Sequence, residues 1–237
     1  MTVLEVPATY GAPDAVLGWV EARLGRGPGT DLVLLPEASL TGYVSPRADF
    51  DLRRFAEPPG GPTSQKLSAL AARREVAVAA PLILREGAAC FNAVVVHDAS
   101  GRLVATYRKR HPWFPERWAA PGPEGPPLFE LGELKVTIAI CYDGHFLEEE
   151  ADSRRALSEA DLLLFPSAWV DEKDSRTPLL AGLARGFGIS IAAANWAPGV
   201  VRVPGQGDAY LMGPEGDVLA RAVDGRADAE VRRRAVQ

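Results

Sequence analysis

Three segments from the first half of this chain recur, in the same order, in its second half. TDLVLLPEAS (residues 30–39) is matched by ADLLLFPSAW (160–169), and both are aliphatic runs that lead into a proline. LSALAARREVAVAAPL (67–82) is matched by LLAGLARGFGISIAAANW (179–196), and FNAVVVHDASGRLVATYR (91–108) by DAYLMGPEGDVLARAV (208–223). The patterns predict a buried strand, a helix that runs into a strand, and a hairpin. The repeat therefore restricts the chain to folds with two equivalent halves.

Each half also begins with a strand and a helix of its own. We expect these at residues 2–6 and 13–24 in the first half, and at 135–140 and 147–159 in the second. Strands that alternate with helices need helices as cover, and hairpins add antiparallel strands whose second face must also be buried. The predicted fold is α/β, with two mixed sheets face to face and helices outside. This is a four-layer α-β-β-α sandwich with an internal pseudo-twofold repeat.

Length and composition favour one domain and exclude several classes of protein. We expect residues 1–237 to form a single domain whose halves meet in a Pro/Gly-rich loop near residues 119–133. The 26 Lys and Arg against 31 Asp and Glu give a formal charge of −5, so no nucleic-acid partner is expected. No apolar run approaches the ~20 residues that span a bilayer, and the start lacks a signal-peptide pattern. We therefore expect a cytoplasmic protein with no membrane partner.

Polar side chains follow four of the expected strands. Glu37 comes after LVLLP, Lys109 after RLVATYR, Cys141 after KVTIAI and Ser167 after LLLFP. In parallel α/β sheets the functional groups gather just past the carboxyl ends of the strands. Cys90 and Cys141 form no CxxC pair and have no histidine at metal-ligand spacing, so neither a disulfide nor a metal site is predicted.

If Glu37, Lys109 and Cys141 converge, they can hydrolyse an amide. A thiol has a pKa near ~8.5, so a nucleophilic cysteine needs a base or a neighbouring cation, and Glu37 is a candidate base. Attack on a carbonyl creates an oxyanion, for which the Lys109 ammonium and the backbone N–H of Tyr142 are candidate donors. An isolated cysteine after an aliphatic strand is otherwise most often part of the core.

At these residues the chain resembles the nitrilase superfamily, the carbon–nitrogen hydrolases. The resemblance rests on LLPEASLTGY around Glu37, YRKRHPWFPERW around Lys109 and ICYDGHF around Cys141, in the family's order, and it covers nearly the whole chain. It implies the same four-layer fold and a Glu37, Lys109, Cys141 catalytic triad. It also implies a second glutamate after the lysine, for which Glu116 is the best match. CYD and RKRHPWFP resemble the amidase branches, aliphatic amidases in particular.

Aromatic side chains near the strand ends are the candidates for a substrate pocket. Tyr43, Trp113, Trp169 and Trp196 can line a small apolar pocket, although tryptophans also pack at subunit contacts. His145 stands where many relatives in the family have arginine, and it either contacts substrate or caps the next helix. A pocket closed by tryptophans favours a compact acyl group.

Three other residues receive simpler interpretations. His97 lies at the edge of a hairpin and is expected to face water. Cys90 precedes an aliphatic strand and is expected to be structural. Asn92 lies on that strand and is expected to support the site from it.

The sequence therefore predicts a thiol amidohydrolase that cleaves a small, linear, non-peptide carboxamide to the carboxylic acid and ammonia through a cysteine thioester. No metal or cofactor is expected. We expect the chain to form a homodimer or a higher homo-oligomer. One alternative is an N-carbamoyl hydrolase or ω-amidase, which needs a cation for the distal carboxylate of its substrate; Arg176, Arg185 and Arg202 are the candidates. Another is a catalytically idle relative that serves as a binding module.

Overall fold

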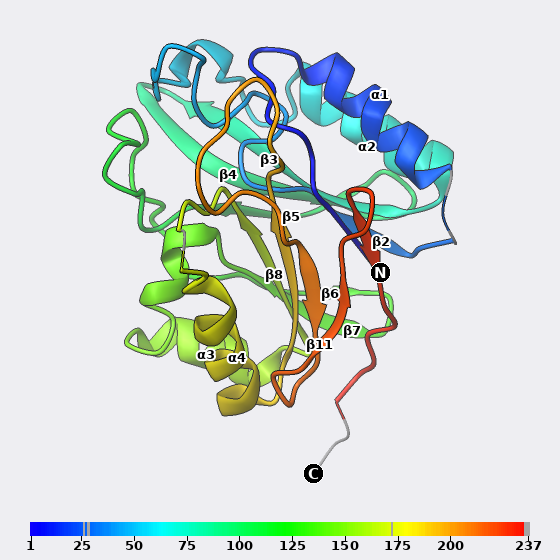
Figure 1. Ribbon diagram of the computed structural model, residues 1–237. Helices are drawn as coiled ribbons and strands as arrows, with labels where there is room; N and C mark the ends of the chain where they lie inside the picture. The colour runs from blue at the N-terminus through cyan, green and yellow to red at the C-terminus, as the bar shows by residue number, and fades with distance from the viewer. Residues whose placement is uncertain (26, 28, 172, 235–237) are drawn as a thin grey trace.

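The computed structural model describes residues 1–25, 27, 29–171 and 173–234. Its strands form two six-stranded sheets that pack face to face (Figure 1). Across the first sheet the order is β12 (Arg226–Asp228), β1 (Thr2–Leu4), β2 (Leu32–Leu34), β3 (Ala77–Glu86), β4 (Ala89–His97) and β5 (Leu103–Arg108). Across the second it is β11 (Val218–Arg221), β10 (Tyr210–Met212), β9 (Ser190–Asn195), β8 (Leu162–Ser167), β7 (Leu134–Ile138) and β6 (Leu128–Leu131).

The two sheets repeat one pattern of strand directions. In the first, β1, β2 and β3 run parallel, and β4 and β5 continue antiparallel. In the second, β7, β8 and β9 run parallel, and β10 and β11 continue antiparallel. Both sheets are therefore mixed, as the repeat in the sequence predicts.

Helices cover the outer face of each sheet. The helices α1 (Pro13–Leu24) and α2 (Pro62–Arg74) pack on the first, while α3 (Ala151–Glu159) and α4 (Arg176–Phe187) pack on the second. Figure 1 shows the two pairs at opposite sides of the molecule. Short 3₁₀ turns lie at η1 (Arg53–Phe55) and η2 (Cys141–His145). The predicted four-layer sandwich is confirmed.

Strands β2 and β8 show why their sequences are aliphatic at every position. Leu34 points into the core between the sheets, whereas its neighbour Val33 points into the core under α1 and α2. In β8, Leu164 points between the sheets and Leu163 points towards α3 and α4. Alternate side chains of a strand point to opposite faces, so a strand covered on both faces needs apolar residues throughout.

The last strand of each half crosses to the other sheet. Strand β6 follows β5 in the chain but pairs with β7 of the second sheet, and β12 follows β11 but pairs with β1 of the first. The region near residues 119–133, predicted as a loop, thus contains β6. Each half closes the sheet of the other, which ties the two halves together.

Two other expectations need correction. His97 does not face water, because α2 covers β4 there; the side chain is buried and its Nε2 lies 3.4 Å from Ser64 Oγ. The helix predicted from residue 147 begins at Ala151, after the η2 turn and the residues that follow it. No helix in the described part of the chain is long and apolar enough to cross a membrane.

Candidate active site

A buried lysine joins two buried glutamates at the carboxyl ends of the strands. Lys109 follows β5, and its Nζ lies 2.7 Å from Glu37 Oε1 and 2.7 Å from Glu116 Oε1. All three side chains are almost completely buried. Burial alone would lower the pKa of Lys109, but Glu37 and Glu116 outweigh it and raise that pKa above its usual value. The two glutamates therefore favour the charged form of Lys109.

Glu37 is fixed through both of its carboxylate oxygens. It follows β2 directly after Pro36, and Oε1 accepts hydrogen bonds from Lys109 Nζ and from Asn92 Nδ2, each at 2.7 Å. Its Oε2 accepts from the backbone N–H of Ala168 at 2.9 Å. Ala168 follows β8, so this last bond connects the two halves of the molecule.

Glu116 is oriented by three donors that lie far apart in the sequence. Besides Lys109, the hydroxyl of Tyr43 donates to its Oε1 at 2.6 Å, and Asn92 Nδ2 donates to its Oε2 at 3.4 Å. Burial raises the pKa of Glu116, Lys109 lowers it and Glu37 raises it, and the net direction is upward. Asn92 touches both glutamates, in agreement with its expected supporting position on β4.

Cys141 begins a tight turn just beyond β7. Its φ of 48° lies in the left-handed region, which is uncommon for a residue with a side chain. Gly144 allows the turn to pack closely, because a Cβ there would lie 3.0 Å from the ring of Phe165. The turn places Cys141 where Glu37, Lys109 and Glu116 act on its electrostatics, and the residue remains half-buried rather than enclosed in the core.

The electrostatics of Cys141 favour a neutral thiol at rest. Burial raises its pKa most and Glu37 raises it further, while Lys109 and the Ala168 N–H lower it, with a net direction well above the usual value. A thiol in this state needs a base to become a nucleophile. The carboxylate of Glu37 is the nearby group suited to that task.

Cys141 opens into a cavity of about 250 Å³. Its walls come from the loop after Lys109, from the η2 turn and from the segment after β8. The lining residues are Trp113, Cys141, Tyr142, His145, Ala168, Trp169, Val170, Asp171 and Ser175. The structure therefore brings three of the four predicted substrate-binding residues, Trp113, His145 and Trp169, to one cavity, together with Tyr142.

Two aromatic candidates lie behind this cavity instead of in its wall. Tyr43 is buried and its hydroxyl is engaged by Glu116. Trp196 is also buried, and its Nε1 donates to the carbonyl oxygen of Trp169 at 3.1 Å. Tyr43 therefore supports Glu116 of the cluster, and Trp196 supports Trp169 of the cavity wall.

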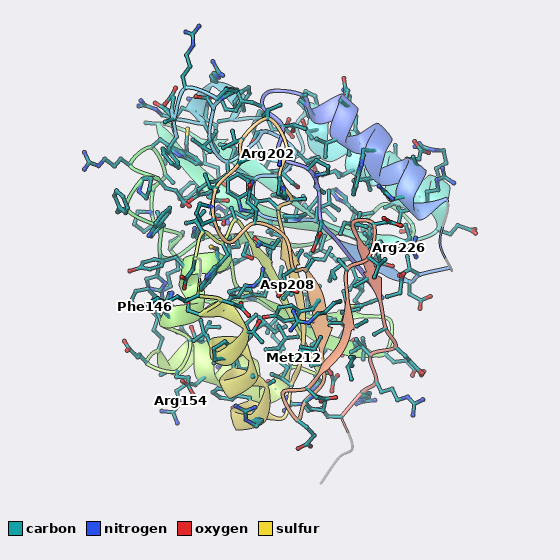
Figure 2. The ribbon with its side chains drawn as sticks, viewed as in Figure 1. Phe146, Arg154, Arg202, Asp208, Met212 and Arg226 are labelled. Carbon is teal, nitrogen blue, oxygen red and sulfur yellow. The ribbon has the colours of Figure 1, made fainter. Side chains whose placement is uncertain are left out.

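The three arginines considered as carboxylate ligands do not line the cavity. Arg176 is buried, with its guanidinium near Ser167 and the backbone of Asp208, a residue labelled in Figure 2. Arg185 is exposed on α4, and Arg202 is exposed in the loop between β9 and β10 (Figure 2). None of them belongs to the described lining.

Sequence reasoning missed one residue close to Cys141 in the chain. Asp143, the third residue of the motif CYD, is buried and accepts hydrogen bonds from the hydroxyl of Tyr107 and from the backbone N–H of His111. Its partners lie in the other half of the repeat, so no local pattern marks the connection. Among the described residues, no three His, Cys, Asp or Glu side chains are grouped to hold a metal ion.

Comparison with known proteins decides the family. Residues 16–232 match the family model of the carbon-nitrogen hydrolases. The chain is a carbon–nitrogen hydrolase. This hydrolase is 27% identical to an N-carbamoylputrescine amidase of Solanum lycopersicum over 226 residues, which cover 85% of this chain and 74% of that one. It is 26% identical to a citrullinase of Francisella tularensis over 214 residues, 82% of this chain and 73% of that one.

The carbon–nitrogen hydrolase also matches solved structures. The crystal structure of an amidase from Nesterenkonia sp. covers 95% of this chain and 87% of its own, with a TM-score of 0.81 and 25% sequence identity. Amidase neighbours from the nitrilase superfamily share the layered α/β fold. The resemblance to the amidase branches of the nitrilase superfamily is thereby confirmed.

Proposed function

We propose that this hydrolase cleaves a small, linear, non-peptide carboxamide to the carboxylic acid and ammonia through a thioester on Cys141. The observation that carries the proposal is the buried Glu37–Lys109–Glu116 cluster beside the cavity into which Cys141 opens. Burying two carboxylates and an ammonium is costly and adds little stability, so a cluster of this kind more often serves chemistry.

Acylation begins with proton transfer. Glu37 takes the proton of the Cys141 thiol while the sulfur attacks the carbonyl carbon, so that a C–S bond forms and negative charge moves to the carbonyl oxygen. Lys109 and the backbone N–H of Tyr142 stabilise that charge. Glu37 then passes its proton to the amide nitrogen, the C–N bond breaks, and ammonia leaves a thioester on Cys141.

Deacylation repeats these roles with water as the nucleophile. Glu37 takes a proton from water, whose oxygen attacks the thioester carbon, and the C–S bond breaks as the acid forms. The proton returns to the sulfur and the thiol is restored. The overall reaction consumes one water and releases one acid and one ammonia.

Lys109 retains a donor for the substrate. An ammonium has three N–H donors, and among the described contacts Lys109 uses two of them on Glu37 and Glu116. The third can therefore bind the developing oxyanion. In this scheme Glu116 holds the ammonium in place, and Tyr43 and Asn92 in turn hold Glu116.

The cavity favours a neutral or amine-bearing substrate over one with a carboxylate. Trp113, Tyr142 and Trp169 give it aromatic walls, and its described lining contains the carboxylate of Asp171 but no lysine or arginine. Like charges repel, so a substrate carboxylate would be disfavoured there, whereas aromatic faces attract a cation. A carbamoylated amine is therefore the second candidate, supported by the relatives named N-carbamoylputrescine amidase.

Three amides with four-carbon chains and different charge, together with one carbamoylated amine, test the proposal. Ammonia release is measured with butyramide, 4-aminobutyramide, succinamic acid and N-carbamoylputrescine, together with intact-protein mass spectrometry. We expect kcat/KM for succinamic acid to be at least about tenfold below that for butyramide, a difference of about 1.4 kcal/mol. Preferred turnover of the acid would instead support an ω-amidase.

Two cysteine variants provide matched controls. Cys141→Ala should release no ammonia and form no acyl adduct, whereas Cys90→Ala, at a buried position of β4, should retain both. In one structure of a glutamate-to-glutamine mutant of an amidase from Nesterenkonia sp., the acetamide moiety of fluoroacetamide is covalently attached to the active-site cysteine, which supports a nucleophilic role for Cys141. Absence of turnover and adduct with every substrate would favour a catalytically idle binding protein.

A further inference from the structure

One buried carboxylate holds the chain on both sides of Cys141 and of Lys109. Asp143 Oδ2 accepts from the hydroxyl of Tyr107 at 2.9 Å and from the backbone N–H of Ile140 at 3.0 Å. Its Oδ1 accepts from the backbone N–H of His111 at 2.8 Å, and His111 Nδ1 lies 3.1 Å away. Tyr107 and His111 flank Lys109, whereas Ile140 and Asp143 flank Cys141.

The imidazole of His111 is itself fixed from three directions. Besides Asp143, its Nε2 lies 3.2 Å from Glu150, and its ring stacks on Phe146 with centroids 4.0 Å apart. Figure 2 labels Phe146, which lies just after η2. Arg110 is the cation nearest to this arrangement, and its guanidinium forms ion pairs with Glu150 and with Asp152. The charges that face His111 are thus Asp143 and Glu150, opposed by Arg110.

These contacts explain how Cys141 keeps its unusual backbone conformation. A non-glycine residue persists in the left-handed region only when its surroundings fix it. The hydrogen bond from Ile140 N–H to Asp143 closes the turn around Cys141, and the bonds from Tyr107 and His111 attach that turn to the end of β5. Asp143 and His111 do not belong to the described lining of the cavity, so they act through Cys141 and Lys109.

We propose that Asp143 and His111 are positioning residues that fix the distance and orientation of the Cys141 sulfur relative to Lys109 and Glu37. The proposal rests on the proposed function for its catalytic consequence, since it assumes that Cys141 is the nucleophile. A displacement of about 1 Å between reacting groups can lower a rate roughly 10²-fold. Loss of the contact should therefore lower the acylation rate, and with it kcat, while KM changes little because the cavity wall remains.

A pair of His111 variants isolates the contact with Asp143. In His111→Asn the amide nitrogen takes the place of Nδ1 and can donate to Asp143, but it no longer reaches Glu150. In His111→Gln the amide takes the place of Nε2, so it reaches Glu150 and loses the side-chain contact with Asp143. The backbone N–H of residue 111 can still donate to Asp143 in both variants. Both variants replace the imidazole by a neutral amide, so they differ mainly in which carboxylate the side chain contacts.

The experiment measures alkylation of Cys141 by iodoacetamide from pH 6 to 9, located by mass spectrometry, with buried Cys90 as the internal reference. The rate of acyl-adduct formation with butyramide and the melting temperature are measured on the same samples. We expect His111→Asn to stay within about threefold of the wild type, and His111→Gln to fall about tenfold or more in both rates. Tyr107→Phe, which removes one bond to Asp143 without changing charge, should fall between them.

Equal rates for the Asn and Gln variants would overturn the proposal, and so would losses that follow the melting temperatures instead of the contact with Asp143. Failure of the proposed function has a different result: the wild type would form no acyl adduct. Alkylation would still report the position of the sulfur in that case, so the two ideas fail separately.

Discussion

Replacement of Lys109 by methionine tests the ionic state of the buried cluster. Methionine fills nearly the same volume without charge, so Lys109→Met leaves Glu37 and Glu116 buried beside each other with no cation between them. Removing one partner of a buried ion pair costs about 3–5 kcal/mol. For a chain of this length each kcal/mol shifts the melting temperature by roughly 2–4 °C, so we expect a fall of roughly 6–20 °C near pH 7. Turnover should disappear.

The stability lost in Lys109→Met should depend on pH. Burial already raises the pKa of Glu116 in the wild type, and loss of Lys109 removes a cation that lowers it. A carboxyl whose pKa is higher in the folded state than in the unfolded state destabilises the fold as pH rises through the folded pKa. The deficit of Lys109→Met should therefore be small near pH 4 and grow towards pH 7. Thermal melts at fixed protein concentration measure it.

The double variant Lys109→Met/Glu116→Gln is the control. It removes one of the two uncompensated carboxylates, so it should recover part of the lost stability at pH 7 and none of the activity. The reasoning is refuted if Lys109→Met melts within about 3 °C of the wild type at pH 7, a shift worth only about 1 kcal/mol. A cluster that tolerates the loss of its cation is not held by ionic interactions.

Three other predictions concern the proposed base, two histidines and the oligomeric state. Glu37→Gln should fold and form no acyl adduct, because the amide cannot accept the thiol proton; an adduct at the wild-type rate in mass spectrometry would point to another base. Asp143 raises the pKa of His111, so the stability that His111 contributes should be lost as pH rises above about 6.5. Burial lowers the pKa of His97, so the stability that depends on neutral His97 should be lost as pH falls below about 6.5. Melts of His111→Asn and His97→Gln should each lack the corresponding slope. Light scattering at micromolar concentration should give the mass of a homodimer or higher homo-oligomer, and a monomer would contradict that expectation.

The sequence predicts the architecture because the repeat is visible as a pattern. It predicts the positions of Glu37, Lys109 and Cys141 because each follows an aliphatic strand, and the structure brings Glu37 and Lys109 into contact. Strands β6 and β12 are missed because they contain four and three residues, in segments without clear alternation. The four hydrogen bonds of Asp143 are missed because two of its partners lie in the other half of the chain.

The prediction that His97 faces water was wrong for a related reason. Position along a hairpin indicates how close a residue is to the turn, but it does not indicate what covers the strand. Here α2 packs over β4 and brings Ser64 to the imidazole. The sequence likewise does not indicate the burial of Arg176. This charged residue at the start of α4 is buried against the ring of Tyr210 and the backbone of Asp208.

The repeat also shows how the second half differs from the first at the position of Glu37. In the matched segments, Ser167 occupies the position in the second half that Glu37 occupies in the first. Ser167 Oγ donates to the backbone of Ala194 and lies 3.3 Å from Asn195 Oδ1, which also accepts from the backbone N–H of Trp169 at 2.9 Å. The strand end of the second half therefore contributes Ala168 and Trp169 to the cavity lining. In the proposed mechanism the matched strand end of the first half supplies the base, so the two halves would contribute proton transfer and substrate positioning.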